Sequence, residues 1–504
     1  MKSARPLPWS GDIALPTRQL AEQVFSRTAG APLISGNAIR LLKDAEENYP
    51  AWLEALRSAR KTIHFESYII HEDEVGRRFG ELLREKAREG VTVRLLYDWI
   101  GGLGKTSRHF WNWLREAGVE VRCFNPLHWD SPLGWVTRDH RKMIAVDGEV
   151  AFVTGLCLGR HWAGDPLRGI EPWRDTGVAI RGPALADIER TFGEVWATTG
   201  APLPATEIPV RELIPPAGEV ALRVIGTAPA TAGLYRLDQL IGALARTTLW
   251  LTDAYFVGST SYLQVLRAAA QDGVDVRLLV PGTTDIPILR GFSRAIYQPL
   301  LESGVRVFEW DGSMIHAKTA VADGRWARVG SSNLNMASWV GNYELDVAVE
   351  DESFARDMET MYLEDLSHCT EVVLSPRGKV RLSEARTERP VLEKTIASGS
   401  VGRAGVRAIG LGGTLGAAIT NHRVLGPAEA RVTGVAGLLI LLIALAFALW
   451  PWWTALPLIG LCGWIGLALL LRTAKLLWKK KSPDPPPGPQ NLTRPEEERR
   501  GGNG

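Results

Sequence analysis

The chain of 504 residues contains an internal duplication, and this duplication restricts its possible folds more than any other feature of the sequence. In each copy an apolar strand pattern is followed by a helical pattern ending in a strand, and then by a second helix-then-strand pattern. The corresponding segments are TIHFESYII (62–70) and TLWLTDAYF (248–256), REGVTVRLLYDW (88–99) and QDGVDVRLLVPG (271–282), and LREAGVEVRCF (114–124) and LLESGVRVFEW (300–310). This alternation predicts an α/β fold with a largely parallel, helix-covered sheet in two similar domains.

Each copy closes with the same pattern, H-x-K-x4-D. The first comprises His140, Lys142 and Asp147, and the second comprises His316, Lys318 and Asp323. One such pattern arises by chance in roughly 2–3% of chains of this composition. Two copies at equivalent positions of a repeat therefore indicate function, whereas a lone His-x-Lys would be typical of a solvated strand edge.

The spacing of the two residues suits chemistry on phosphate. In a strand, His and Lys at positions i and i+2 point to the same face. There the lysine binds phosphate oxygens, while the histidine attacks phosphorus or transfers a proton. If the two copies meet at a pseudo-twofold axis, their histidines lie on opposite sides of one phosphorus. One would then form a covalent phosphohistidine and the other would act as general acid and base, without any need for a metal or cofactor.

Three polar residues follow His316 at short intervals: Ser331 and Asn333 lie within GSSNLN, and Glu344 lies within NYELDV. Serine and asparagine donate hydrogen bonds to phosphate oxygens. A carboxylate can hold one tautomer of an imidazole and support its charge. Elsewhere this segment would be a turn with a surface charge; after His316 we expect it to serve the site.

These motifs resemble those of the phospholipase D superfamily, and within it the bacterial cardiolipin synthase branch. The resemblance covers about residues 35–375 and rests on the two H-x-K-x4-D motifs, Glu344, GSSN (330–333), FESYIIHEDEVG (65–76) and WRDTGVAIRGPA (173–184). It implies two α/β/α domains and a ping-pong phosphatidyl transfer through phosphohistidine, with no obligatory metal. It also implies that His140 is the nucleophile and His316 the general acid and base, although the sequence alone does not separate these roles.

The first copy departs from the family pattern. Its segment matching GSSN is TGLCLG, which puts Cys157 where asparagine is expected, and the position 28 residues after His140 is Arg168. We therefore expect Asp175 to be the imidazole partner in the first half. Asp147 and Asp323 either support the site or shape the turns that follow them.

One further motif needs a separate interpretation. GGLGKTS (101–107) is similar to a phosphate-binding P-loop, but the G-x4-G-K-[ST] pattern requires glycine at position 99, which is Trp99. We expect a loop that follows a strand and borders the active site. The 19 tryptophans are interpreted as core and membrane-interface residues without a chemical role.

A long apolar segment predicts a membrane anchor. Residues 432–471 carry no charge, and Trp450-Pro451-Trp452-Trp453 interrupts them near the middle. We expect a hairpin of two transmembrane helices whose basic flanks keep both ends cytoplasmic; the alternative is a buried helical hairpin in a soluble core. The N-terminus has no segment of this kind, unlike typical cardiolipin synthases. Four widely spaced cysteines, expected to be reduced and mostly buried, also indicate a cytoplasm-facing protein.

The pattern divides the chain into seven segments. They are an N-terminal extension (1–34), a first phospholipase D-like domain (35–200), a Pro-rich linker (201–220), a second such domain (221–380), a Gly-rich basic juxtamembrane tether (381–431), two transmembrane helices (432–471), and a basic, then disordered tail (472–504).

Charge and motifs together predict a membrane-anchored enzyme of the bacterial inner membrane that joins two phosphatidylglycerols into cardiolipin and releases glycerol. The alternative is a phospholipase D hydrolase that releases phosphatidic acid. A nucleic-acid phosphodiesterase is disfavoured because residues 35–380 carry 38 basic and 46 acidic side chains. A degenerate scaffold would have lost a histidine, and both are present. The sequence leaves open the acceptor alcohol, the headgroup preference and the oligomeric state.

Overall fold

The computed structural model describes residues 14–126, 136–285, 294, 296–375 and 380–383, and scattered positions between 438 and 473. Within these residues, no helix has the length and apolar character that a bilayer crossing requires. Apart from the scattered positions and residues 381–383, the predicted tether, hairpin and tail lie outside the described residues. All elements described below belong to the compact unit of residues 1–126 and 134–439.

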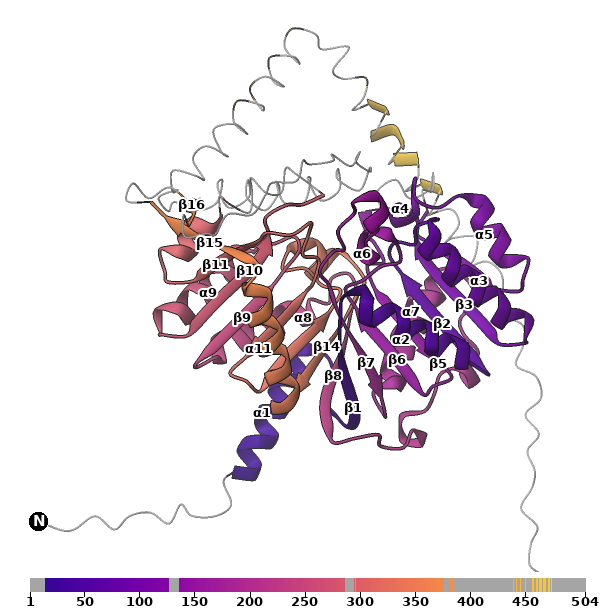
Figure 1. The fold of residues 1–504 in the computed structure, drawn as a ribbon, viewed down its shortest axis with the longest axis horizontal. Coiled ribbons are helices and arrows are strands. Elements are labelled where there is room, and N and C mark those ends of the chain that lie inside the picture. The colour runs from indigo at the N-terminus through magenta and orange to yellow at the C-terminus, as the bar shows by residue number, and fades with distance from the viewer. Residues whose placement is uncertain are drawn as a thin grey trace, which may run out of the picture. The chain divides into compact units, whose positions relative to one another are not determined.

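After helix α1 (Ala14–Ala29), the two halves repeat one order of strands and helices (Figure 1). The first half consists of β1 (Ile34–Lys43), α2 (Asp44–Ser58), β2 (Thr62–Ser67), α3 (Glu74–Arg88), β3 (Thr92–Asp98), α4 (Trp99–Gly102), α5 (Arg108–Arg115), β4 (Glu120–Phe124), β5 (Lys142–Val146), β6 (Val150–Thr154), α6 (Arg160–Ala163), β7 (Thr176–Arg181) and α7 (Leu185–Thr198). The second half consists of β8 (Val220–Thr227), α8 (Gly233–Leu244), β9 (Thr248–Thr252), α9 (Thr260–Gln271), β10 (Asp275–Pro281), β11 (Arg306–Trp310), β12 (Thr319–Ala322), β13 (Trp326–Gly330), β14 (Glu344–Glu350), α11 (Glu352–Leu366), β15 (Cys369–Leu374) and β16 (Val380–Leu382).

The strands are hydrogen-bonded in the order β16-β15-β11-β10-β9-β12-β13-β14-β8-β1-β7-β6-β5-β2-β3-β4. Counted outward from the central β8–β1 pair, the strands β14-β13-β12-β9-β10-β11 of the second half correspond one by one to β7-β6-β5-β2-β3-β4 of the first half. The predicted duplication is therefore present in the topology. Among the named strands of the described residues, the pairs within β2–β3–β4 and β9–β10–β11 are parallel and the other pairs are antiparallel. The prediction of a largely parallel sheet is therefore wrong, because tight turns such as Asp147-Gly148 join neighbouring strands as hairpins.

The halves pack against each other through the strands nearest their shared seam. β6 contacts β13 and β14, and β7 contacts β13. One apolar cluster spans both halves and includes residues of α7 and α11, whereas two separate clusters lie under α2, α3 and α5 and under α8 and α9. Each half therefore has its own helix-covered core, and the common core fixes the two histidine segments relative to each other.

Candidate active site

Short backbone bridges between the halves position both catalytic motifs. The amide of His140 donates to the carbonyl of Tyr343 at 2.9 Å, and the amide of Tyr343 donates to Arg138 at 2.8 Å. In the equivalent place, the amide of His316 donates to the carbonyl of Arg174 at 2.6 Å. Each histidine segment thus runs beside the start of the last repeat strand of the other half, β14 or β7.

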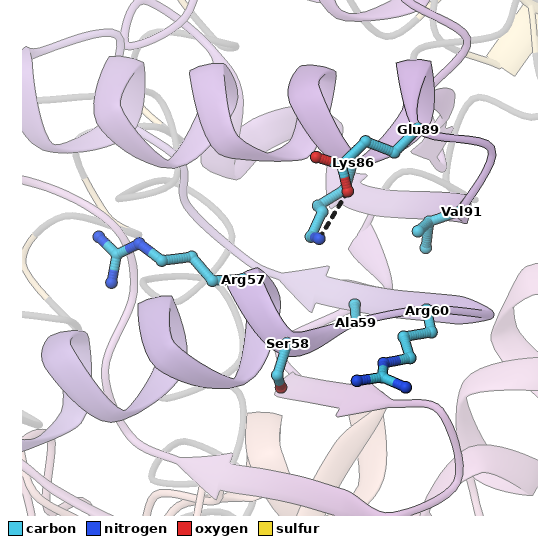
Figure 2. Close-up of a pocket in the computed structure, with 7 residues that line it drawn as sticks. All are labelled: Arg57, Ser58, Ala59, Arg60, Lys86, Glu89 and Val91. Atoms are coloured by element: carbon cyan, nitrogen blue, oxygen red, sulfur yellow. Dashed lines mark hydrogen bonds and ion pairs between the residues drawn. The ribbon is translucent and has the colours of Figure 1, made fainter.

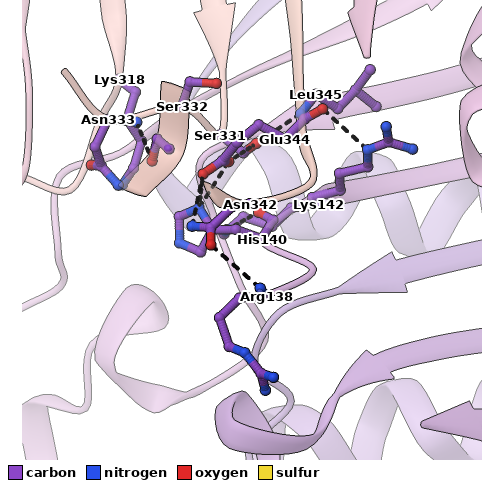
Figure 3. A network of polar contacts seen from close by, with 12 residues as sticks. Arg138, His140, Lys142, Lys318, Ser331, Ser332, Asn333, Asn342, Glu344 and Leu345 are labelled. Carbon is purple, nitrogen blue, oxygen red and sulfur yellow. Dashed lines mark hydrogen bonds and ion pairs between the residues drawn. The ribbon is translucent and has the colours of Figure 1, made fainter. Parts of the chain in front are cut away.

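The side chain of His140 contacts a carboxylate from the second half (Figure 3). Its Nδ1 lies 2.9 Å from Oε2 and 3.1 Å from Oε1 of Glu344, and the hydroxyl of Ser331 donates to the same carboxylate at 2.5 Å. Glu344 and Ser331 are fully buried. Because Nδ1 faces the carboxylate, Nε2 is directed away from it and can approach a phosphorus atom.

The side chain of His316 has the converse arrangement, with a carboxylate from the first half. Its Nδ1 lies 2.7 Å from Oδ2 of Asp175, and the indole Nε1 of Trp162 donates to this oxygen at 3.0 Å. The expected pairing of Asp175 with His140 is therefore wrong, as is that of Glu344 with His316. The carboxylates are exchanged because each half ends at the histidine of the other half.

The two lysines lie inside the site and are fully buried. The ammonium groups of Lys142 and Lys318 donate to the backbone carbonyls of His140 and His316, and Nζ of Lys318 lies 2.9 Å from Nδ1 of His316. Burial lowers the pKa of Lys318 to about 8, although Asp175 acts in the opposite sense. A bound anion would supply the counter-charge that these two ammonium groups need.

Both histidines are shifted toward their neutral forms. Burial and the charge of Lys318 lower the pKa of His316 to about 3, against the opposing effect of Asp175. Burial also lowers the pKa of His140, where Glu344 opposes the shift and Lys142 and Lys318 add to it. The lysine of each motif thus lowers the pKa of the histidine of the other motif, which places the two motifs in one site.

The first half departs from the family pattern at two positions of its site, and neighbouring residues compensate for the missing serine. Gly155 occupies the place of Ser331, and a Cβ there would lie 2.1 Å from Oδ1 of Asp175. The shorter aspartate thus fills the space that a serine would take, and Trp162 replaces the serine as donor. Cys157 stands in the position of Asn333 and is buried; burial raises the pKa of its thiol, against the effects of both lysines. The other three cysteines are not buried, contrary to expectation.

The motif aspartates lie away from the histidines. The carboxylate of Asp147 accepts the backbone N–H groups of residues 60–62 at 2.7–2.8 Å, and that of Asp323 accepts those of residues 246–248 at 2.7–3.1 Å. Both residues have positive φ angles, 56° and 51°. They hold the β5–β6 and β12–β13 turns to the starts of β2 and β9, which is the structural alternative considered above. Arg168 lies near the surface beside Asp165.

Several aromatic residues at the site were not predicted. The ring of Tyr68 lies 4.8 Å from that of His140, and the rings of Trp162, Trp173 and Tyr255 lie 5.6, 5.7 and 5.9 Å from that of His316. Both tyrosines follow the first parallel strand of their half, a repeat signal that could have identified them. The interpretation of the tryptophans as chemically silent fails for Trp162.

Asn333 is buried, and its Oδ1 has no hydrogen-bond partner within the described part of the chain. Ser331, in contrast, is engaged with Glu344 and with the amide of Leu345. Of the two predicted phosphate donors, the structure assigns Ser331 to the support of the carboxylate, so the remaining candidate donor is the Nδ2 group of Asn333.

A separate hollow of about 450 Å³ lies between the ends of α2 and α3 (Figure 2). Arg57, Arg60 and Lys86 line it, and Lys86 forms an ion pair with Glu89 at 2.7 Å. It lies at the start of β2, whereas Tyr68 and the histidines lie beyond the end of that strand, roughly 20 Å away for six residues. The hollow is therefore distinct from the candidate active site.

Comparison with known proteins agrees with the motifs. The family described as "Cardiolipin synthase, PLD-like domain" matches residues 52–163 and 239–366. Cardiolipin synthase A of Pseudomonas fluorescens (strain SBW25) is 34% identical over 353 residues, covering 68% of this chain and 71% of the relative. Cardiolipin synthase A of Pseudomonas aeruginosa (strain LESB58) is 32% identical over 410 residues, covering 76% and 80%.

The fold has a counterpart among solved structures. Phosphatidylserine synthase of Haemophilus influenzae Rd KW20 superimposes with a TM-score of 0.56 at 14% identity, covering 70% of this chain and 92% of that protein. The predicted two-domain α/β architecture is thus confirmed. From its motifs, its duplicated fold and its sequence relatives, the chain belongs to the phospholipase D superfamily, in the cardiolipin synthase-like branch of phosphatidyltransferases.

Proposed function

We propose that this protein is a membrane-anchored cardiolipin synthase that transfers a phosphatidyl group from one phosphatidylglycerol to another. The observation that carries the proposal is the pair of His–carboxylate contacts exchanged between the halves, with two buried lysines beside them. Such a site offers two imidazoles to one phosphodiester and neutralises its charge. The relatives named above are cardiolipin synthases, which supports a phospholipid as donor and as acceptor.

The first half-reaction transfers the phosphatidyl group to the protein. Nε2 of His140 attacks phosphorus, so a P–N bond forms while the bond from phosphorus to the glycerol oxygen breaks. His316 gives its proton to the departing glycerol. Lys142, Lys318 and the amide of Asn333 bind the phosphate oxygens. The bound phosphodiester adds a negative charge, which favours the protonated form of His316 that the leaving group needs.

The second half-reaction restores the histidine. Neutral His316 takes the proton of the free hydroxyl of a second phosphatidylglycerol, whose oxygen attacks phosphorus. A P–O bond forms, the P–N bond breaks, and cardiolipin leaves. Water in place of the lipid would give phosphatidic acid. Glu344 and Asp175 hold the two rings and support the positive charge that each acquires during the cycle.

The site would act at the cytoplasmic face of a bacterial inner membrane. The uncharged segment 432–471 supports this part of the proposal, because it is long enough for two crossings and has basic flanks. Cell fractionation tests it directly. The full chain should sediment with membranes and resist extraction by high salt, and extraction by salt alone would contradict the anchor.

The activity itself is tested with purified protein in liposomes containing glycerol-labelled phosphatidylglycerol. Cardiolipin and free glycerol, identified by mass spectrometry, are the expected products. Phosphatidic acid with free glycerol would identify a hydrolase instead. His140→Ala and His316→Ala should each abolish turnover while thermal unfolding remains cooperative; substantial turnover in either variant would contradict the two-histidine mechanism.

A further inference from the structure

The segment GGLGKTS (101–107), which comprises the end of α4 and the loop after it, lies beside the catalytic centre. The amide of Glu72 donates to the carbonyl of Lys105 at 3.0 Å. Gly101 packs directly on the preceding segment, since a Cβ at this position would lie 1.8 Å from the carbonyl oxygen of Tyr68. Tyr68 in turn contacts the ring of His140. This packing fixes the half-buried Lys105 at the rim of the site; the predicted loop borders the site as expected, but its first two residues belong to α4.

Two further imidazoles form a continuous aromatic wall that reaches the second catalytic histidine. The rings of His71 and His161 are 5.7 Å apart, and His161 stacks on Trp173 at 5.3 Å. Trp173 lies 5.7 Å from His316. His71, His161 and Trp173 are all half-buried, and Nε2 of His71 has no hydrogen-bond partner among the described residues. The wall therefore joins half-buried positions to His316 and carries polar groups that the mechanism does not use.

The cation of this rim is Lys105, and the carboxylates of Asp73 and Asp285 lie near the cluster, since both raise the pKa of His161 and Asp285 also raises that of Lys105. Burial and then Lys105 lower the pKa of both His71 and His161, so the imidazoles are neutral beside one ammonium. Burial lowers the pKa of Lys105, whereas Cys157 and Asp285 raise it. Within the described residues the ammonium forms no ion pair, and the carboxylate of Asp285 accepts the hydroxyl of Tyr255 at 2.8 Å.

We propose that Lys105, with His161 and His71 beside it, binds the phosphate of the acceptor phospholipid. The inference rests on the proposed function and names the subsite for its second substrate. Lys142 and Lys318 are engaged by the donor phosphate, so a second anionic headgroup needs another cation. In phosphatidylglycerol only a three-carbon glycerol separates the phosphate from the free hydroxyl. Holding that phosphate at the rim presents the hydroxyl to the phosphohistidine.

The test uses competition between acceptors for one intermediate. Full-length protein in phosphatidylglycerol liposomes is supplied with ethanol, and the ratio of cardiolipin to phosphatidylethanol is measured by mass spectrometry. Both products form from the same phosphatidyl-histidine, so the ratio reports acceptor binding independently of the donor. In Lys105→Gln the ratio should fall by about 10- to 100-fold, as expected for loss of one charge-assisted hydrogen bond. Lys105→Arg should restore most of it. Lys61→Gln, at the exposed start of β2, is the matched control.

A ratio in Lys105→Gln that stays within about twofold of the wild-type value would overturn the subsite, whether or not total turnover falls. Glycerol 3-phosphate, an anionic alcohol, can replace the lipid acceptor in the same competition with ethanol and should show the same dependence on Lys105. This arm separates the two hypotheses. A wild-type protein that makes no cardiolipin refutes the proposed function, whereas only an unchanged preference for the anionic acceptor refutes the role of Lys105.

Discussion

Replacing Glu344 by glutamine should slow turnover by about 10²- to 10⁴-fold while the protein stays folded. The carboxylate is fully buried and lies 2.9 and 3.1 Å from Nδ1 of His140. Glutamine keeps the shape and removes the charge. Loss of one partner from a buried ion pair costs about 3–5 kcal/mol. Because His140 becomes positively charged only during the reaction, we assign this cost to the barrier, where each 1.36 kcal/mol is about tenfold in rate.

The assay is single-turnover transfer in phosphatidylglycerol liposomes, with thermal unfolding measured on the same preparation. Glu350→Gln is the matched control, since Glu350 lies at the far end of β14 and its ion pair with Arg223 is away from the site. It should change the rate by less than about threefold. If Glu344→Gln retains more than a third of the wild-type rate, the carboxylate does not support His140 and the reasoning fails.

A double-mutant cycle tests the exchange of carboxylates independently of catalysis. His140→Gln combined with Glu344→Gln should be non-additive in the free energy of unfolding by about 0.5–3 kcal/mol, because the two side chains touch. His316→Gln combined with Glu344→Gln should be close to additive. The reverse result would show that each carboxylate serves the histidine of its own half.

Three further predictions concern single residues. Activity should fall as the pH rises through about 8, because Lys318 loses its charge there. In Lys318→Arg the remaining activity should persist to higher pH. If the pH–rate profile of this variant shows the same alkaline loss, Lys318 is not the group whose titration causes it. Gly155→Ala should reduce turnover by about 10²-fold, since its methyl group displaces Asp175; Gly341→Ala, which has open space around it, is the control. Asp147→Asn should lower the free energy of unfolding by about 1–3 kcal/mol, measured by denaturant titration, and leave kcat within about threefold; a much larger loss of kcat would give this residue a chemical role.

Much of the site can be predicted from the sequence because strand periodicity is a local property and the repeat marks equivalent positions in the two halves. A histidine and a lysine two positions apart must share a face, and their recurrence at equivalent positions predicts that both face one ligand. Asp147-Gly148 and Asp323-Gly324 are hairpin signals that predict antiparallel pairs, whereas the alternation of helices and strands alone predicts mostly parallel strands and is wrong for this sheet.

The pairing of the carboxylates could not be read from distances along the chain. Asp175 and Glu344 stand in corresponding segments, WRDTGVAI (173–180) and NYELDVAV (342–349). Their alignment identifies both as equivalent, but which histidine each contacts depends on how the two halves pack. That packing arises from apolar contacts between β6, β7, β13 and β14, whose side chains give no sign of their partner strands in the sequence.

Because each carboxylate contacts the histidine of the other half, the two halves can differ in sequence and still form equivalent histidine–carboxylate pairs. Each carboxylate needs one donor to keep it aligned with its imidazole: Ser331 serves Glu344, and Trp162 serves Asp175. With the longer Glu344, the second half has room for a serine side chain; with the shorter Asp175, the first half has a glycine and takes its donor from α6. Each histidine is therefore supported by a carboxylate and its donor across the seam, so the motif of the first half can depart from the family pattern while the geometry around both histidines is kept.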